Sequence, residues 1–174
     1  MGEAIVEGRP TEPVEPTEVV EPTGEPQWLD ADEHRAWRAF VLTTHLLDRA
    51  LDQQLQRDAG MPHAHYMILV ILSESPDRQL RMSDLARGLR YSPSRMSHAV
   101  ASLERNGWIE RRPTPTDRRG QLAVLTEAGF QALAAAAPSH VAEVRARVFD
   151  QLTPEHVTQL GQICDALLPG LEDR

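Results

Sequence analysis

The sequence predicts a mainly α-helical fold that carries one small β-ribbon. Leucine and alanine dominate the apolar residues, and aromatic residues make up only 5% of the chain, a balance that favours helices over strands. Apolar residues recur at helical spacing over most of the chain, whereas residues 108–125 contain two short strand-like runs around prolines and a glycine. With 174 residues and 41% hydrophobic content, the chain is long enough for one domain with a core.

The first 29 residues are predicted to form a disordered, acidic and proline-rich tail. Residues 1–26 contain almost no large apolar side chains, and the pair Glu-Pro recurs at residues 12–13, 15–16, 21–22 and 25–26. Such a segment cannot bury enough apolar surface to fold. A solvated arm without a defined role and an arm that binds a partner both stay open for it, while residues 30–174 are predicted to form a single domain.

Two helices are predicted to follow the tail. Over residues 32–58 an apolar face recurs at spacings of three and four, which predicts a long amphipathic helix that ends at Gly60. This face consists of Trp37, Phe40, Val41, Leu47, Leu51 and Leu55. Pro62 opens a second helix through the segment HAHYMILVIL, which is apolar almost all round and should be buried.

A helix-turn-helix is predicted in the next segment. Ser83 is expected to cap a short helix that runs to about Leu89, and Ser92 is expected to cap a helix with Pro93 at its first position. One face of this second helix is apolar and consists of Met96, Ala99, Val100 and Leu103. The opposite face carries hydrogen-bonding side chains, as in helix-turn-helix motifs.

A β-ribbon is predicted after this motif. The second helix should end at Asn106-Gly107, and strands should follow over residues 108–112 and 121–125. Because the residues between the strands are too many for a two-residue turn, we expect an exposed ribbon, or wing.

Two long helices are predicted to complete the fold. Thr126 should cap a helix that reaches about residue 151 and bends near Pro138. A last helix should begin at Thr153-Pro154-Glu155 and end at Pro169-Gly170.

The charge is unevenly distributed along the chain. The formal net charge is −8, yet ten arginines and only four acidic residues lie between Arg78 and Arg119. A compact basic region on an acidic protein is the electrostatic footprint of a surface that binds a polyanion.

The order of these elements resembles the MarR family of bacterial transcription regulators, over roughly residues 32–171. The family's Asp-x-Arg, its apolar strand ending in Leu-Thr and the glycine that follows fall on Asp117, Arg119, Leu125-Thr126 and Gly129. The segment SHAVASLERNGWIERR is similar to the family's recognition helix and its LExxGLIxR stretch, with Trp108 where leucine is commoner.

The resemblance implies a homodimeric winged helix-turn-helix regulator, with repression as the expected action. Residues 62–126 would form the winged helix-turn-helix lobe, and the helices at 30–58 and 127–172 would form the dimer interface. The terminal helices also have more apolar face than a single lobe can cover. The expected partners are a second copy of the chain and double-stranded DNA with a near-palindromic operator.

The predicted DNA contacts fall into three groups. Arg95 and His98 are the expected readers of base edges, since arginine can bond guanine O6 and N7 bidentately. The recognition helix adds Ser92, Ser94, Ser97, Ser102 and Arg105. On the wing, Asp117 would orient Arg119 in the minor groove and Arg118 would favour phosphate. Further phosphate contacts are expected from Arg81, Ser83, Arg90 and Arg112.

The family also implies a small aromatic effector, often phenolic, that lowers DNA affinity. The candidate pocket residues are Arg35, Arg38, His45 and Tyr66, because they lie on the two helices that would flank such a pocket. Surface charge and core packing explain these four residues equally well.

Other classes of site are not expected. His63 and His65 would diverge on a helix, so we predict no metal site and no cofactor. Cys164, the single cysteine, should be a buried small hydrophobe. No glycine-rich phosphate loop or nucleophile elbow indicates an enzyme. With no apolar span or secretory signal in the sequence, a cytoplasmic protein is expected. A winged-helix domain that binds protein instead of DNA is the alternative.

Overall fold

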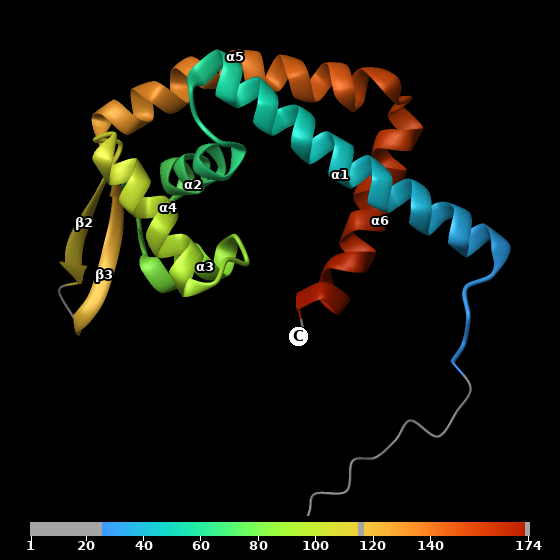
Figure 1. Ribbon diagram of the computed structural model, residues 1–174, viewed down its shortest axis with the longest axis horizontal. Coiled ribbons are helices and arrows are strands. Elements are labelled where there is room, and N and C mark those ends of the chain that lie inside the picture. The colour runs from blue at the N-terminus through green and yellow to red at the C-terminus, as the bar shows by residue number, and fades with distance from the viewer. Residues whose placement is uncertain (1–25, 115–116, 173–174) are drawn as a thin grey trace, which may run out of the picture.

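The computed structural model describes residues 26–114 and 117–172, and for residues 117–119 and 172 it describes the backbone alone. The fold is mainly helical with a small antiparallel sheet, as predicted (Figure 1). The helices of the described residues are α1 (Ala31–Ala59), α2 (His63–Glu74), α3 (Met82–Gly88), α4 (Pro93–Arg105), α5 (Glu127–Arg147) and α6 (Pro154–Glu172). The strands are β1 (Gln79–Arg81), β2 (Ile109–Thr114) and β3 (Asp117–Leu125). The predicted tail over residues 1–29 lies mostly outside the described residues.

Helix α1 begins and ends at strong local signals. The Asp30 side chain accepts hydrogen bonds from the backbone N–H groups of Asp32 and Glu33, and Glu33 Oε2 accepts one from Asp30 N at 2.8 Å. This capping box satisfies N–H groups that have no partner inside the helix. Gly60, with φ of 64°, ends the helix in the left-handed conformation that favours glycine.

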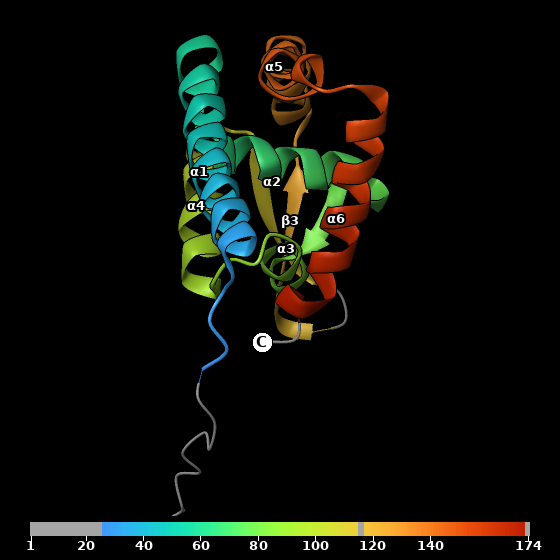
Figure 2. The same cartoon turned by 90° about the vertical axis from the view of Figure 1, so that its right-hand side faces the viewer.

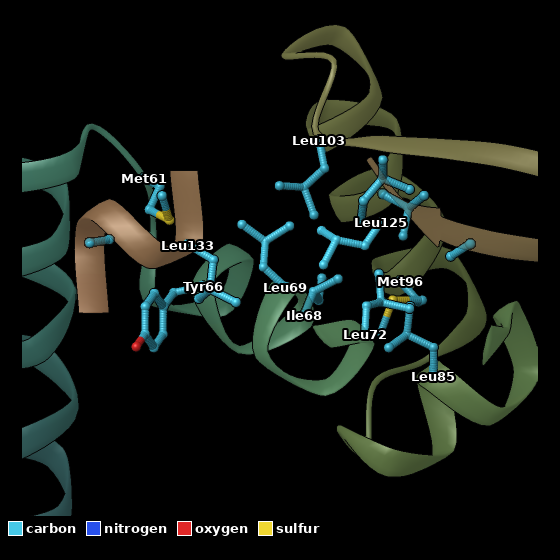
Figure 3. Close-up of a cluster of buried hydrophobic side chains, with 14 of the residues drawn as sticks. Met61, Tyr66, Ile68, Leu69, Leu72, Leu85, Met96, Leu103, Leu125 and Leu133 are labelled. Carbon is cyan, nitrogen blue, oxygen red and sulfur yellow. The ribbon is translucent and has the colours of Figure 1, made fainter. Parts of the chain in front are cut away.

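Helix α2 forms the centre of the core (Figure 3). Ile68, Leu69 and Leu72 are fully buried, and each such side chain contributes about 1.5–3 kcal/mol relative to an exposed position. Leu85 of α3 and Leu103 of α4 pack into the same cluster. The prediction that this helix is buried is confirmed.

The fold has two parts that Figure 1 separates clearly, and in Figure 2 α1 and α6 lie in front of the other part. Helices α2, α3 and α4 and the sheet, with strand order β1-β3-β2, form one lobe. Helices α1 and α6 and the far half of α5 extend away from this lobe. No helix of the described residues is both long and apolar enough to cross a membrane.

The start of α3 differs from the prediction. The cap position is Arg81, which makes no side-chain capping bond, and Ser83 lies inside the first turn. The reason is β1, a three-residue strand that the sequence analysis missed. It pairs with β3 through Leu80 and Ala123, and its extended backbone leads directly into the helix.

The wing strands are longer than predicted. Strand β2 reaches Thr114 and β3 begins at Asp117, and Thr114 pairs with Asp117, so the expectation of a long loop was wrong. Pairing satisfies backbone N–H and C=O groups that a loop would leave to water. Pro113 has no N–H to donate, and it lies where the register shifts between residues 113 and 114.

The C-terminal helices differ from the prediction in their ends. Helix α5 ends at Arg147, and a 3-10 turn, η2 (Phe149–Gln151), follows it. Helix α6 begins where predicted but continues past Pro169. A proline removes a single helical N–H, a cost that the exposed last turn of this helix tolerates. Cys164 is exposed in the single chain and not buried as expected.

Candidate nucleic-acid interface

Helix α4 is held in one orientation by its cap and its inner face. Ser92 Oγ accepts a hydrogen bond from Arg95 N at 3.2 Å, and Pro93 occupies the first turn, as predicted. Met96, Val100 and Leu103 are fully buried. The predicted DNA-contacting residues on the first half of the helix are therefore exposed, namely Ser92, Ser94, Arg95, Ser97 and His98.

The end of α4 lies closer to the body of the lobe. Ser102 is half-buried and Arg105 is exposed in the last turn. Burial, and then the positive charge of Arg105, lower the pKa of His65 on α2. His65 is thus a neighbour of the interface that was predicted only as an ordinary helix-start histidine.

The side chain of Arg95 has a partner that the sequence analysis missed. Its guanidinium carbon lies 4.0 Å from the centre of the Tyr91 ring. Tyr91 precedes the helix, so helical periodicity gave no signal for this pair. The stack places an aromatic surface beside the expected base reader.

A second missed pair joins α4 to the wing. Glu104 Oε1 accepts a hydrogen bond from Arg111 N at 3.1 Å, and Glu104 Oε2 accepts one from Arg111 Nε at 2.7 Å. These bonds from Arg111 hold the pKa of Glu104 below its usual value. The last turn of the helix and the first strand of the wing are thus fixed to each other.

The other predicted phosphate contacts lie on the same lobe. Arg81, Ser83 and Arg90 are exposed around α3, and Arg90 has a left-handed backbone with φ of 53°. Arg112 is exposed on β2, where its guanidinium lies 2.8 Å from Glu110. For Asp117, Arg118 and Arg119 the structure describes backbone alone, at the start of β3, so their predicted roles fall outside the described side chains.

The four candidate effector residues do not form one site in the single chain. Arg35 is exposed and pairs with Asp32 at 3.0 Å, and Arg38 and His45 are exposed on α1. Tyr66 is buried, with its ring centre 4.4 Å from that of His140, and burial raises the pKa of its hydroxyl.

A separate groove of about 690 Å³ is largely apolar and is lined by α1, by α6 and by the segment that joins α5 to α6. Phe40, Leu47, Leu160 and Ile163 are among its lining residues, and none of the four candidate effector residues is.

Among the described residues, no group of three histidine, cysteine or acidic side chains could hold a metal ion.

Known proteins resemble both parts of this fold. The MarR family model matches residues 59–120. The chain is 51% identical to Sco3205, a MarR family transcriptional regulator from Streptomyces coelicolor solved in complex with DNA, with a TM-score of 0.82 over 85% of this chain and 92% of that one. It is 38% identical to AbsC, a MarR family transcriptional regulator from the same organism, with a TM-score of 0.81 over 86% and 100% of the two chains.

A curated relative from another bacterium also matches. The transcriptional repressor MprA of Escherichia coli (strain K12) is 27% identical over 133 residues, which are 75% of each protein. All three likenesses extend well beyond the residues that the family model matches.

Proposed function

The chain belongs to the MarR family of transcriptional regulators, and from this premise we propose that it is a homodimeric repressor that binds a near-palindromic site in double-stranded DNA. Helix α4 enters the major groove, and the wing formed by β2 and β3 lies along the adjacent minor groove. The proposal includes no cofactor and no catalytic activity, and it places the protein in the cytoplasm.

The outer face of α4 is the observation that carries this proposal. The fully buried inner face fixes the rotation of the helix, so Arg95 and His98 point away from the core. An arginine in this position can bond guanine O6 and N7, a contact worth about 1–3 kcal/mol of discrimination against other bases. The serines of the helix and the arginines around α3 and on β2 would contact phosphates and fix the register on the duplex.

A second copy of the chain is the proposed cover for the exposed apolar face of α1 and α6. Trp37 and Phe40 on α1 are 55% and 50% exposed, and Ile163 on α6 is 56% exposed. Exposed apolar patches of this kind mark interaction surfaces in soluble proteins. A symmetric dimer would place two copies of α4 about one helical turn of DNA apart, or about 10–10.5 base pairs. Analytical ultracentrifugation that finds a monomer at micromolar concentration would refute the dimer.

The test of DNA binding is a fluorescence anisotropy titration with duplexes from the protein's own upstream DNA. The Arg95→Ala variant should bind its preferred duplex about tenfold or more weakly. Arg57→Ala removes the same charge from the last turn of α1, outside the lobe, and should leave the affinity close to that of the unchanged protein. Binding to no duplex at low salt would favour the winged-helix module that binds another protein.

The proposal also includes an effector, a small aromatic and often phenolic anion. Its binding would favour a dimer geometry in which the two copies of α4 no longer match the half-site spacing, with a coupling of about 1–3 kcal/mol. Arg35, Arg38, His45 and Tyr66 are the proposed pocket residues. A panel of phenolic acids, screened for release of the labelled duplex, tests this part, and no release by any compound would remove it.

A further inference from the structure

Arg95 differs from three neighbouring arginines in the kind of partner that holds it. Arg87 pairs with Asp84, Arg111 with Glu104 and Arg112 with Glu110. Within the described part of the chain, Arg95 forms no ion pair, and its guanidinium lies on the face of an uncharged ring, that of Tyr91. The residue proposed to read a base is therefore not neutralised by a carboxylate among the described residues.

Tyr91 is a fixed platform for this stack. Its backbone N–H donates a hydrogen bond to Ala86 O at 2.9 Å, and its ring is half-buried against the core. Arg90, directly before it, has the left-handed backbone that turns the chain from α3 towards α4.

The geometry of the stack suits recognition of guanine. An aromatic ring offers the guanidinium no carboxylate oxygens, so it leaves N–H donors of Arg95 available for a base. A carboxylate partner would instead take up those donors and would have to be displaced by DNA. Because the stack holds the long arginine side chain near one conformation, the loss of side-chain entropy on binding DNA is smaller.

We propose that Tyr91 is a positioning residue that presents the edge of Arg95 to one base pair of each half-site and so sets specificity at that position. This inference rests on the proposed function. Its chemistry names the base as guanine, because guanine alone offers two acceptors to an arginine fork in the major groove. Tyr91 itself need not touch the DNA.

The experiment measures discrimination at each position of a site that the unchanged protein selects from random-sequence duplexes. Affinities are determined for the selected site and for every single base-pair substitution in it. Arg95→Ala should abolish the preference for one G·C pair per half-site. Tyr91→Leu should reduce the preference at that same pair by about two- to fivefold per half-site, the usual worth of an exposed stack of this kind. Tyr91→Phe, which keeps the ring, should retain it.

Two controls separate positioning from folding. Leu89→Ala removes a neighbouring half-buried side chain of the same core edge and should weaken binding at all positions alike, without altering the preference at the G·C pair. The double variant Tyr91→Leu, Arg95→Ala should discriminate between base pairs at this position as well as Arg95→Ala alone does, because Tyr91 acts only through Arg95.

The outcomes are distinct. Three results would overturn the inference: an unchanged preference for the G·C pair in Tyr91→Leu, an equal loss of affinity at every position in that variant, or a loss of the preference in Tyr91→Phe. The proposed function would stand in each case, provided that the unchanged protein binds its selected site. An unchanged protein that prefers no site would overturn both.

Discussion

Gly129, at the start of α5, occupies a backbone position with no room for a side chain. A Cβ atom there would lie 2.2 Å from the carbonyl oxygen of Trp108 and 2.8 Å from a methyl group of Leu125. That carbonyl also accepts a hydrogen bond from Thr126 N at 3.1 Å, so it cannot move without cost. The close approach is what joins the base of the wing to α5.

Gly129→Ala should therefore destabilise the protein by about 1–3 kcal/mol, the usual cost of overpacking. Urea unfolding followed by circular dichroism measures this change. Gly88→Ala is the matched control, because a Cβ there would only reach ordinary contact with Ile71 at 4.0 Å. Similar unfolding midpoints for the two variants would contradict the explanation.

His140 gives the stability a dependence on pH. The side chain is 7% exposed, and its Nδ1 lies 3.2 Å from Oε1 of the buried Gln54. Burial, and then the nearby His63, lower the pKa of His140 below its ordinary value of 6.5. The unfolded chain thus takes up a proton near pH 6.5, whereas the folded chain resists it, so acid favours unfolding.

The free energy of unfolding should fall as the pH drops from about 7 to about 5, with stability fully present only above the pKa of the unfolded histidine. The variant His140→Gln cannot titrate at this position but can still donate a hydrogen bond to Gln54, so its free energy of unfolding should fall less steeply with pH. Part of the fall should remain, because the pKa of His65 is lowered in the same direction. Urea titrations at each pH measure both slopes, and identical slopes would exclude His140 as a source.

At the level of elements, the wing depends on Glu104 for its position relative to α4. Glu104 and Arg111 are 29% and 27% exposed, and their bonds include a backbone N–H of β2. Glu104→Gln keeps the shape of the side chain but loses its charge, and should destabilise the protein by about 1–2 kcal/mol. Hydrogen exchange at Arg111 N–H should become faster.

Glu110→Gln is the control for this change. Its pair with Arg112 is 55% and 59% exposed, and such surface pairs contribute about 0–1 kcal/mol. Equal exchange rates at Arg111 in the unchanged protein and in Glu104→Gln would mean that strand pairing alone holds the wing.

Elements with local signals could be predicted from the sequence, and elements defined by distant partners could not. Ser92 and Pro93 start α4, and buried residues spaced by three and four define its inner face, so its position was predicted. Strand β1 has three residues and exists because it pairs with β3, some forty positions later. The length of the wing strands likewise depends on cross-strand register, which no local pattern shows.

The same division holds for the candidate site. The exposed face of α4 followed from its periodicity. The partners of its side chains, Tyr91 for Arg95 and Arg111 for Glu104, did not, because Tyr91 precedes the helix and Arg111 lies on β2. A periodic pattern reports which face is buried and contains no information on contacts between elements.

Across the whole molecule, the basic residues are concentrated where the proposed function needs them. The chain has a net charge of −8, but the arginine-rich segment from Arg78 to Arg119 forms α3, α4, β1, β2 and the start of β3. Ions screen charges beyond a Debye length of about 8 Å, so acidic residues on α1 and α6 matter little to DNA at the lobe. The exposed apolar side chains of α1 and α6 instead suit these helices to the proposed dimer contact.

The wing provides the last prediction, and it concerns how DNA affinity depends on salt. The backbone of β3 carries Arg118 and Arg119 at the end of the ribbon furthest from α5 (Figure 1). We propose that Arg118 contacts phosphate and that Arg119, oriented by Asp117, enters the minor groove, where a narrow A·T-rich groove concentrates negative potential. Arg118→Ala should then weaken specific and nonspecific binding alike.

The two variants should differ in a way that anisotropy titrations at several salt concentrations can resolve. Binding releases about one counterion fewer for each phosphate contact that is lost. Arg118→Ala should therefore reduce the steepness of the plot of log affinity against log salt by about one unit per lobe. Arg119→Ala should weaken the selected site and reduce the preference for A·T pairs beside it, while fold and dimer persist. Because the lobe keeps its other arginines, both variants should still bind DNA. An unchanged affinity and slope in the double variant would mean that the wing does not contact DNA, and recognition would then rest on α4 alone.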